Sequence, residues 1–373
     1  MESAGNMPLA VSSYAGLHGL ADDDKFLNLA WTIDEQAYLG IDLPALVAEE
    51  LTREVSGGTP SISTYGVDDP YGEARLGPAV ARFFGTPDGF SVTCGAGVNS
   101  LLYALAHLAH GGTTVVVGNV YPDLPVWIER LTAIRPVGIQ LGQGGWPIAD
   151  IEAAKARLVV LERPMLTATA ASVEMVQDIC SIVAKHGGIV LVDESYANYC
   201  PPSYSACTVS HAVTNLVVLR GLSKAYWLGG LRLGYCVASE PLTHQVRALV
   251  PPMLASSLSL TIGRRVLEQG DIGWPLRTRI ETAKVEVIDR LAQVGLGKDA
   301  WTAPFLPYVA FSDRRDILGW LERCGILGKR QLFWDAGSAT IMGCQRLSIP
   351  LAPHRLARFH KSIGSPERQN RRG

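Results

Sequence analysis

The stretch that decides the fold is Leu216-Val-Val-Leu-Arg-Gly-Leu-Ser-Lys-Ala-Tyr-Trp-Leu-Gly-Gly-Leu-Arg-Leu-Gly-Tyr235. Its apolar beginning, residues 216–219, predicts a buried strand. Lys224 follows that strand, at the position where α/β folds place their chemistry. A lysine beside Ser223 and shortly before Arg232 suits a phosphorylated aldehyde cofactor, because the amine can form a Schiff base while the hydroxyl and the guanidinium hold the phosphate. The stretch alone is also compatible with a surface lysine at a strand end.

A second stretch, Gly188-Ile-Val-Leu-Val-Asp-Glu-Ser-Tyr196, is another apolar run that ends in acid. Asp193 precedes Lys224 by about the length of one strand and its connection. Pyridoxal phosphate needs a carboxylate that keeps its ring nitrogen protonated, because protonation makes the ring an electron sink. Tyr196 can reach the phenolic oxygen of the same cofactor. The two stretches together predict a pyridoxal 5'-phosphate site in which Lys224, Asp193 and Tyr196 are catalytic.

In order and spacing, the chain from about Tyr65 to Arg346 resembles the fold-type I pyridoxal-phosphate-dependent aminotransferases of class I and II, most closely their histidinol-phosphate aminotransferase-like branch. The resemblance implies an α/β fold with a mixed, mostly parallel seven-stranded sheet and a second, smaller α+β domain. The alternation of apolar strands with helical segments supports the α/β class independently. The matching motifs are Val192-Asp193-Glu194-Ser195-Tyr196, Ser223-Lys224 and Leu231-Arg232-Leu233-Gly234-Tyr235.

The same resemblance predicts the domain organisation. Residues 1–40 are expected to form an N-terminal arm and part of the small domain. Residues 41–250 are expected to form the large cofactor-binding domain, and residues 251–373 the small domain with an interdomain helix within 274–294. The family pattern also implies a homodimer, in which the arm contacts the partner subunit.

The phosphate of the cofactor is expected at the stretch Ser91-Val-Thr-Cys-Gly-Ala-Gly97, which precedes an apolar helix predicted over residues 98–109. Small residues at a helix N-terminus let backbone amides approach a phosphate, and the helix dipole adds to the attraction. The resemblance places the phosphate cup at Gly95, Ala96 and Gly97. It also assigns Tyr121 to stacking on the pyridine ring, where offset π contact holds the ring flat.

Two further residues are assigned by the resemblance. A tyrosine in the loop over residues 63–72 crosses to the cofactor phosphate of the neighbouring subunit, and Tyr65 matches this position best, with Tyr71 as the alternative. Arg346, near the end of a strand predicted over residues 339–349, is expected to bind the substrate α-carboxylate in the bidentate geometry that suits a guanidinium. Both assignments compete with ordinary packing or surface roles.

The chain departs from the family pattern in two places. Where relatives carry an asparagine that donates a hydrogen bond to the phenolic oxygen of the cofactor, the stretch Arg163-Pro-Met-Leu-Thr-Ala-Thr169 has Leu166, which cannot donate one. Arg163, or a hydroxyl of Thr167 or Thr169, is a candidate to compensate, and Tyr196 alone is another solution. Trp227 stands where relatives usually have glycine, so it either narrows the pocket or packs against the arm.

Composition limits the class of protein. Of 373 residues, 47% are hydrophobic and 18% charged, which predicts a globular protein with a substantial core. The net charge of −2 gives no electrostatic basis for nucleic acid or an anionic membrane as partner. Seven cysteines without a C-x-x-C pair indicate reduced thiols, not a disulfide framework or a metal site. No apolar run reaches a membrane span and residues 1–25 lack a signal-peptide pattern, so we expect a cytoplasmic protein.

These observations predict an aminotransferase that moves an amino group between an L-α-amino acid and a 2-oxo acid through a Schiff base on Lys224. The departures at Leu166 and Trp227 keep open a pyridoxal phosphate enzyme with another outcome, namely cyclisation, elimination, decarboxylation or oxidation. A binding protein that kept the fold without catalysis is the third possibility. The side chain of the substrate is not disclosed, and Glu162, Arg163 and Glu35 are only guesses for residues that contact it.

Overall fold

The computed structural model describes residues 22–57, 63, 65–141, 145–166 and 171–364. Its larger sheet has seven strands, in which β9 is antiparallel to both of its neighbours and the other pairings are parallel. The strands, in spatial order, are β2 (Phe90–Ala96), β9 (Leu233–Ser239), β8 (Leu216–Gly221), β7 (Ile189–Asp193), β6 (Leu158–Glu162), β3 (Thr114–Val117) and β5 (Val137–Ile139). The predicted mixed, mostly parallel seven-stranded sheet is confirmed.

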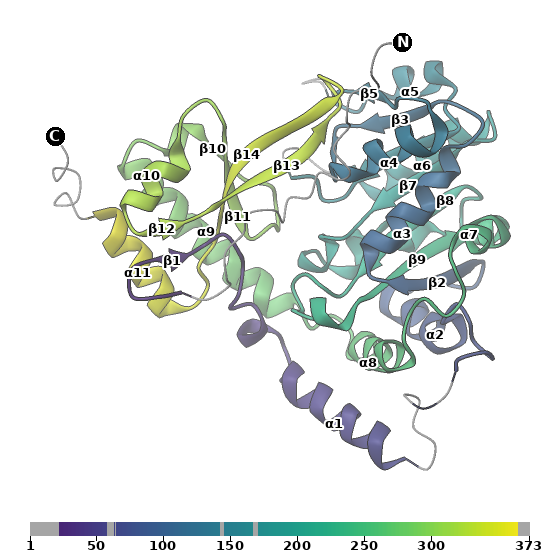
Figure 1. Cartoon of the computed structure of the whole chain (residues 1–373), viewed down its shortest axis with the longest axis horizontal. Coiled ribbons are helices and arrows are strands. Elements are labelled where there is room, and N and C mark those ends of the chain that lie inside the picture. Colours follow the sequence, from purple (N-terminus) through teal and green to yellow (C-terminus); the bar gives the residue numbers. More distant parts are fainter. Residues whose placement is uncertain (1–21, 58–62, 64, 142–144, 167–170, 365–373) are drawn as a thin grey trace, which may run out of the picture.

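Helices cover both faces of this sheet (Figure 1). Because β6, β7 and β8 are buried on both faces, they read in the sequence as continuous apolar runs. On one face the core includes side chains from α3 (Val98–Leu105), α4 (Asp123–Thr132) and α7 (Thr243–Leu249). On the other face it includes side chains from α2 (Glu73–Phe84), α5 (Ile148–Ala154), α6 (Val173–Ala184) and α8 (Ser257–Glu268).

A second sheet of five strands forms the smaller α+β part, at the left of Figure 1. Its order is β10 (Ala300–Trp301), β11 (Tyr308–Ser312), β14 (Thr340–Ser348), β13 (Lys329–Asp335) and β4 (Asn119–Val120). The helices of this part are α10 (Ile317–Arg323) and α11 (Pro353–Gly364), and α9 (Trp274–Gln293) is the predicted interdomain helix.

Three segments connect the two parts in ways that the linear order of the chain hides. β4 lies between β3 and α4 in sequence, yet it pairs with β13 of the smaller sheet. β1 (Leu27–Asn28), from the N-terminal segment, pairs in parallel with β12 (Ile326–Leu327). α1 (Leu43–Ser56) projects from the body of the molecule in Figure 1, and Asp42 caps it by accepting a hydrogen bond from the amide of Ala45. The proposed domain boundaries at residues 40 and 250 stay a prediction.

The parallel strands end at one edge of the larger sheet, and this edge faces the smaller sheet. β6 and β7 end in acids, Glu162 and Asp193, and β8 continues into the loop that carries Lys224. Ligands in open α/β sheets bind outside the carboxyl ends of the strands. No helix within the described residues is long and apolar enough to cross a membrane.

Candidate active site

A cavity of about 540 Å³ lies at this edge, between the two sheets. Its lining combines the predicted residues of the larger sheet with side chains from the N-terminal segment, β11, β13 and β14. It includes Trp31, Thr32, Glu35, Val98, Asn99, Asn119, Tyr121, Glu162, Leu166, Asp193, Ser195, Tyr196, Tyr199, Ser223, Lys224, Trp227, Arg232, Tyr308, Lys329, Gln331 and Arg346.

Lys224 lies half-buried in the loop that follows β8, with its Nζ 3.7 Å from the ring centroid of Tyr196. Asn198 holds this loop in place. Its Nδ2 donates hydrogen bonds to the carbonyl oxygens of Gly221 (2.6 Å) and of Lys224 itself (3.2 Å). The lysine amine therefore projects into the cavity from a backbone fixed on both sides.

Asp193 ends β7 with a side chain that is almost fully buried. Its Oδ1 accepts hydrogen bonds from the amide of Ser195 at 2.8 Å and from the hydroxyl of the same residue. Burial raises the pKa of Asp193, while the Ser195 hydrogen bond and the charge of Lys224 act in the opposite direction. A buried carboxylate at this point fits a partner that carries a proton on nitrogen.

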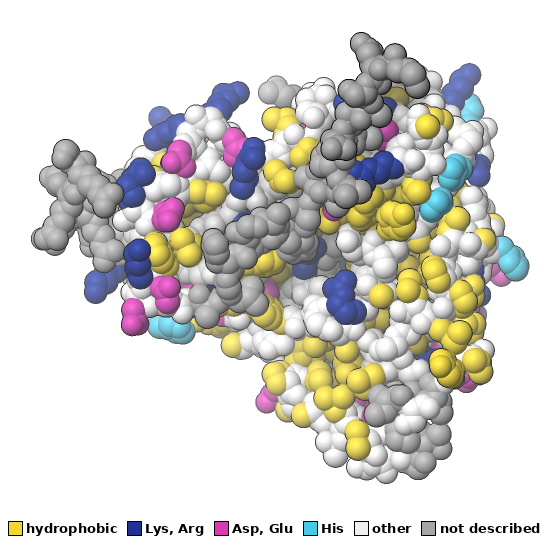
Figure 2. Space-filling view, in the orientation of Figure 1, with side chains coloured by type: hydrophobic (Ala, Val, Ile, Leu, Met, Phe, Trp, Pro, Cys, Tyr) yellow, Lys and Arg dark blue, Asp and Glu magenta, His cyan; other side chains and the backbone are white. Residues whose placement is uncertain are grey.

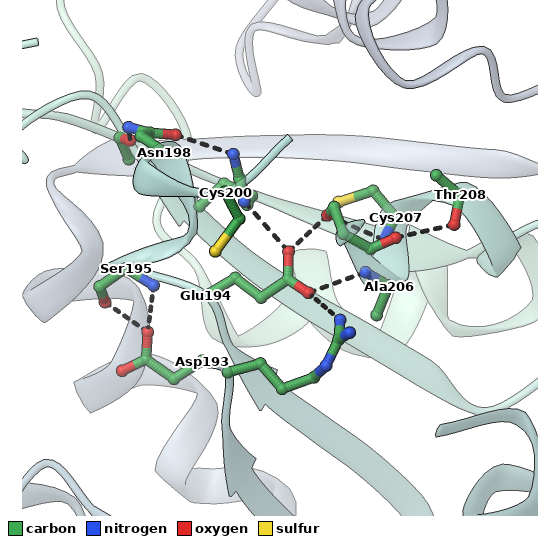
Figure 3. Close-up of polar contacts among 12 residues, drawn as sticks. Asp193, Glu194, Ser195, Asn198, Cys200, Ala206, Cys207 and Thr208 are labelled. Carbon is green, nitrogen blue, oxygen red and sulfur yellow. Dashed lines mark hydrogen bonds and ion pairs between the residues drawn. The ribbon is translucent and has the colours of Figure 1, made fainter. Parts of the chain in front are cut away.

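The next residue, Glu194, points away from the cavity into a polar network (Figure 3). Its Oε1 accepts from Arg163 Nη1 at 2.7 Å and its Oε2 from Arg220 Nη1 at 3.1 Å, and all three side chains are buried. The amide of Ala206 and the hydroxyl of Ser205 also donate to this carboxylate. The network ties together the ends of β6, β7 and β8, which carry Glu162, Asp193 and the Lys224 loop.

Arg163 is committed to Glu194 and does not line the cavity. The hypothesis that its guanidinium replaces the missing asparagine is therefore wrong. The same ion pair also holds Arg163 away from any substrate in the cavity. Thr167 and Thr169, the other candidates, lie outside the described residues. Leu166 lines the cavity and packs against the core, so this wall is apolar.

Arg346 enters the cavity from β14 and is buried. Its Nη1 lies 3.4 Å from the hydroxyl of Tyr196 and 3.3 Å from Oε1 of Gln331, and its guanidinium carbon lies 4.3 Å from the ring centroid of Tyr308. Within the described residues its Nε has no hydrogen-bond partner and its guanidinium makes no ion pair. Burial lowers the pKa of Arg346, but Tyr196 and Tyr308 outweigh this effect and hold it above its usual value. A buried, permanently charged guanidinium without a carboxylate fits an anionic ligand.

The predicted phosphate cup lies around Arg232. Its Nη2 is 3.3 Å from the carbonyl oxygen of Ala96, and a side chain on Gly97 would lie 2.5 Å from the same nitrogen. Gly97 also has φ of 85°, a conformation that residues with a side chain rarely adopt, so the backbone favours glycine there. Ser223 and Arg232 line the cavity. At the turn itself the lining residues are Val98 and Asn99, which begin α3, and not Gly95, Ala96 or Gly97. The role of these residues as a phosphate cup stays a prediction.

The predicted tyrosines have different surroundings. Tyr121 lines the cavity, and its hydroxyl donates to Oδ2 of Asp123 at 3.0 Å. Tyr71 donates to the carbonyl oxygen of Arg247 at 3.2 Å, which holds it within its own chain. Tyr65 is 86% exposed and does not line the cavity of its own chain. The reach of Tyr65 into a partner subunit stays a prediction.

Trp227 both narrows the cavity and contacts the N-terminal segment, so the two roles expected for it are combined. It lines the cavity, and its Nε1 donates to the carbonyl oxygen of Thr32 in the N-terminal segment at 2.9 Å. Its backbone has φ of 57°, a left-handed conformation that is uncommon for a bulky residue. The indole thus fastens the segment with Trp31 and Thr32 over the cavity.

Sequence reasoning missed Lys329 altogether and gave Glu35 and Glu162 no definite place. Glu35 is buried and accepts a hydrogen bond from the hydroxyl of Tyr199, and burial raises its pKa to about 7. Lys329 is buried with its Nζ 4.5 Å from the ring centroid of Trp31. Burial, with the nearby charges of Arg346 and Lys224, lowers the pKa of Lys329 to about 6. Only the pairing of Lys329 with Arg346 across β13 and β14 could have signalled its position.

Comparison with known proteins identifies the family of this chain. The model of aminotransferase class I and II matches residues 47–315. The chain belongs to the class I and II aminotransferases. The predicted resemblance and fold class are confirmed, and so is pyridoxal 5'-phosphate as the cofactor of the family. The donor set of the cavity fits that cofactor, since it offers an amine, a buried carboxylate, an aromatic ring and an arginine beside a glycine turn.

Curated relatives include the histidinol-phosphate aminotransferase of Thermoanaerobacter pseudethanolicus, 38% identical over 237 residues, which covers 61% of this chain and 65% of that protein. The corresponding enzyme of Chlorobium luteolum is 31% identical over 237 residues and is covered to 62%, against 61% of this chain. The chain therefore spans less than two thirds of the length of either relative.

Solved structures support the fold. The histidinol-phosphate aminotransferase of Clostridium acetobutylicum superposes with a TM-score of 0.72 at 12% identity, over 90% of this chain and 97% of that one. The enzyme of the same name from Sinorhizobium meliloti, solved with pyridoxal-5'-phosphate, gives a TM-score of 0.63 at 18% identity, over 87% and 86% of the two chains. An aspartate aminotransferase from Rhodobacter sphaeroides gives 0.67 at 18% identity, over 93% and 94%.

Proposed function

We propose that this protein is a pyridoxal-phosphate-dependent aminotransferase that moves an amino group between an L-α-amino acid and a 2-oxo acid. One observation carries the proposal: Lys224 and Arg346 meet at Tyr196 inside one cavity. The lysine Nζ lies over the tyrosine ring at 3.7 Å from its centroid, and the arginine Nη1 lies 3.4 Å from its hydroxyl. A substrate whose carboxylate binds Arg346 would thus have its α-carbon near the lysine amine.

Each chemical group of the cofactor would be held by a residue of suitable chemistry in the cavity. Bound in this way, pyridoxal phosphate supplies an electron sink for the carbanion formed at the substrate α-carbon. Lys224 would hold its aldehyde, Asp193 its ring nitrogen, Tyr121 its ring face, Tyr196 its phenolic oxygen, and Ser223, Arg232 and the turn of Gly95, Ala96 and Gly97 its phosphate.

The residues of the chain then divide the work. The Nζ of Lys224 would take the proton of the substrate α-carbon as general base. Arg346 fixes both the position and the rotation of the α-carboxylate, because a guanidinium binds two oxygens in one plane. The N-terminal segment, held by the hydrogen bond of Trp227 to Thr32, keeps water from the cavity.

A second function is favoured by the apolar wall at Leu166. Without an amide at that position, loss of the α-proton would lead to cyclisation, elimination or oxidation by an external oxidant, whereas decarboxylation would break the bond to the α-carboxylate instead. A single-turnover experiment separates the two. Holoprotein mixed with an amino acid and no 2-oxo acid should release one 2-oxo acid for each cofactor converted to its pyridoxamine form. Repeated turnover without that conversion would support the second function, and purified protein that takes up no cofactor would contradict both.

We also propose that the protein is a cytoplasmic homodimer. Its seven cysteines all lie among the described residues and form no disulfide, as in a reducing compartment. Leu51 and Val55 of α1 are exposed, with Val55 at 66%. Figure 2 shows hydrophobic side chains gathered in the region where Figure 1 places α1 and α8. Sedimentation should give twice the chain mass, and Tyr65→Phe should then weaken cofactor binding if its hydroxyl reaches the phosphate of the partner subunit.

A further inference from the structure

Glu162 and Asp193 form a pair at the floor of the cavity. Glu162 is the last residue of β6, Asp193 is the last of β7, and the two are direct neighbours in the register of these parallel strands. Two residues earlier on each strand, Val160 and Leu191 both belong to the core on the side of α3 and α4. Because side chains alternate along a strand, Glu162 and Asp193 point to that same side, about 4.8 Å apart at the backbone.

The two carboxyl groups have unequal surroundings. Asp193 accepts two hydrogen bonds from Ser195, and both favour its ionised form. Among the described residues, the donor that acts on Glu162 is the backbone amide of Tyr121, which lowers its pKa. The charged and titratable groups that face Glu162 are Asp193 on β7, Lys224 after β8 and Tyr308 on β11.

This inequality decides which acid keeps a proton. Two buried carboxylates side by side resist double ionisation, so the one with fewer donors stays protonated. Within the described residues Glu162 takes part in no ion pair, and it is 9% exposed. Burial, followed by the charge of Asp193, raises the pKa of Glu162 to about 8, whereas Lys224 acts against this rise. A protonated Glu162, which lines the cavity, would offer its O–H to an acceptor there.

We propose that Glu162 is a second acidic residue of the cofactor site, and that its O–H donates a hydrogen bond to the phenolic oxygen of pyridoxal phosphate while Asp193 holds the ring nitrogen. The ring nitrogen and the carbon that bears the phenolic oxygen are separated by one ring carbon, so both groups lie on one side of the ring, and the two acids lie on neighbouring strands. Glutamate has one methylene more than aspartate and reaches further over the ring. The inference rests on the proposed cofactor site.

A neutral acid suits this place better than a second carboxylate. A protonated carboxyl group can serve as a hydrogen-bond donor at neutral pH when an apolar site holds its proton. It stabilises negative charge on the phenolic oxygen without adding charge beside Asp193. Leu166, on the neighbouring wall, has no donor to offer, and Arg163 is bound to Glu194.

The test uses cofactor binding and spectra, not turnover. Glu162→Gln retains an N–H donor of similar shape, whereas Glu162→Leu removes the donor. We expect Glu162→Gln to bind pyridoxal phosphate within about threefold of wild type, and Glu162→Leu to bind it at least about tenfold more weakly, as for a lost hydrogen bond to a charged oxygen. The pH midpoint of the visible absorption change of bound cofactor should move in Glu162→Leu and stay in Glu162→Gln.

Infrared spectroscopy supplies a measurement that does not need the leucine variant to fold. At pH 7 the wild type should show the carbonyl band of a protonated carboxylic acid, and Glu162→Gln should lack it. Subtracting the spectrum of Glu162→Gln from that of the wild type removes any such band from Glu35, which both proteins contain. Absence of this band, or wild-type affinity and pH midpoint in Glu162→Leu, would overturn the proposal. The proposal would also be overturned if Asn119→Ala, and not Glu162→Leu, lost cofactor affinity. Asn119 lines the cavity and carries an amide that would then be the donor to the phenolic oxygen. If the wild type binds no cofactor, the proposed function itself fails.

Discussion

Replacing Glu194 by glutamine removes the negative charge that Arg163 and Arg220 share. The exposed fraction of each of these three side chains is 2% or less, and the two ion pairs span 2.7 and 3.1 Å. Breaking a buried pair by removing one partner costs about 3–5 kcal/mol, because the remaining charge stays buried without compensation. Here two guanidinium groups lose their counter-charge at once, so we expect the free energy of unfolding to fall by about 4 kcal/mol or more.

Urea unfolding of the apoprotein measures this loss, with the midpoint falling while the slope stays unchanged. The chain offers a matched control in Glu152→Gln, because Glu152 and Lys185 also form a pair at 2.7 Å, with side chains 46% and 58% exposed. That variant should lose at most about 1 kcal/mol. Equal losses in the two variants would refute the reasoning, since burial would then make no difference to the value of the pair.

Four further changes test the site. Asp193→Asn should retain cofactor but lower the single-turnover rate at least about a hundredfold, as loss of a placed charge does, and near-normal rates would show that Asp193 is misassigned. Arg346→Lys should raise KM for an amino acid and lower kcat without changing cofactor absorbance; wild-type kinetics would move the carboxylate anchor elsewhere. Lys329→Met should remove a rise in apoprotein stability between about pH 6 and 10, because a lysine with pKa about 6 binds fewer protons folded than unfolded across that window. Glu35→Gln should remove a fall in stability between about pH 4 and 7, since the raised pKa of Glu35 makes the folded state bind more protons there than the unfolded state. For both Lys329→Met and Glu35→Gln, a pH dependence of the urea midpoint equal to that of the wild type would contradict the assignment.

The parts of the site that the sequence predicts lie at the ends of apolar strands. β7 and β8 are continuous apolar runs that stop at polar residues, so Asp193 and the Lys224 loop could be placed from local pattern alone. A helix runs over Trp274–Gln293, within residues 274–294 where the interdomain helix is expected, and its interdomain role stays a prediction. Helix α3 ends earlier than its apolar pattern indicates, at Leu105, because residues 106–109 continue as a 3-10 helix.

The remainder depends on pairing between distant segments, which no local pattern encodes. Lys329 opens β13, and only the register of β13 with β14 brings it beside Arg346. Glu35 lies in a segment that reads as irregular, and its burial follows from contact with Tyr199, far along the chain. The sequence left Arg163 open as a donor because its partner, Glu194, follows a different strand, β7.

Burial also changes the charge that the cavity presents to a substrate. Three ionisable side chains of the lining, Glu35, Glu162 and Lys329, would be charged at pH 7 if they were exposed to water. Burial raises the pKa of both glutamates and lowers the pKa of the lysine. All three shifts favour the neutral form near pH 7. The guanidinium of Arg346 cannot lose its proton and keeps its charge. Because the same burial lowers the local dielectric, an anion bound there interacts more strongly than it would in water. The lasting positive charge of the cavity therefore lies at its guanidinium groups, Arg346 where a substrate carboxylate would bind and Arg232 where the cofactor phosphate is expected.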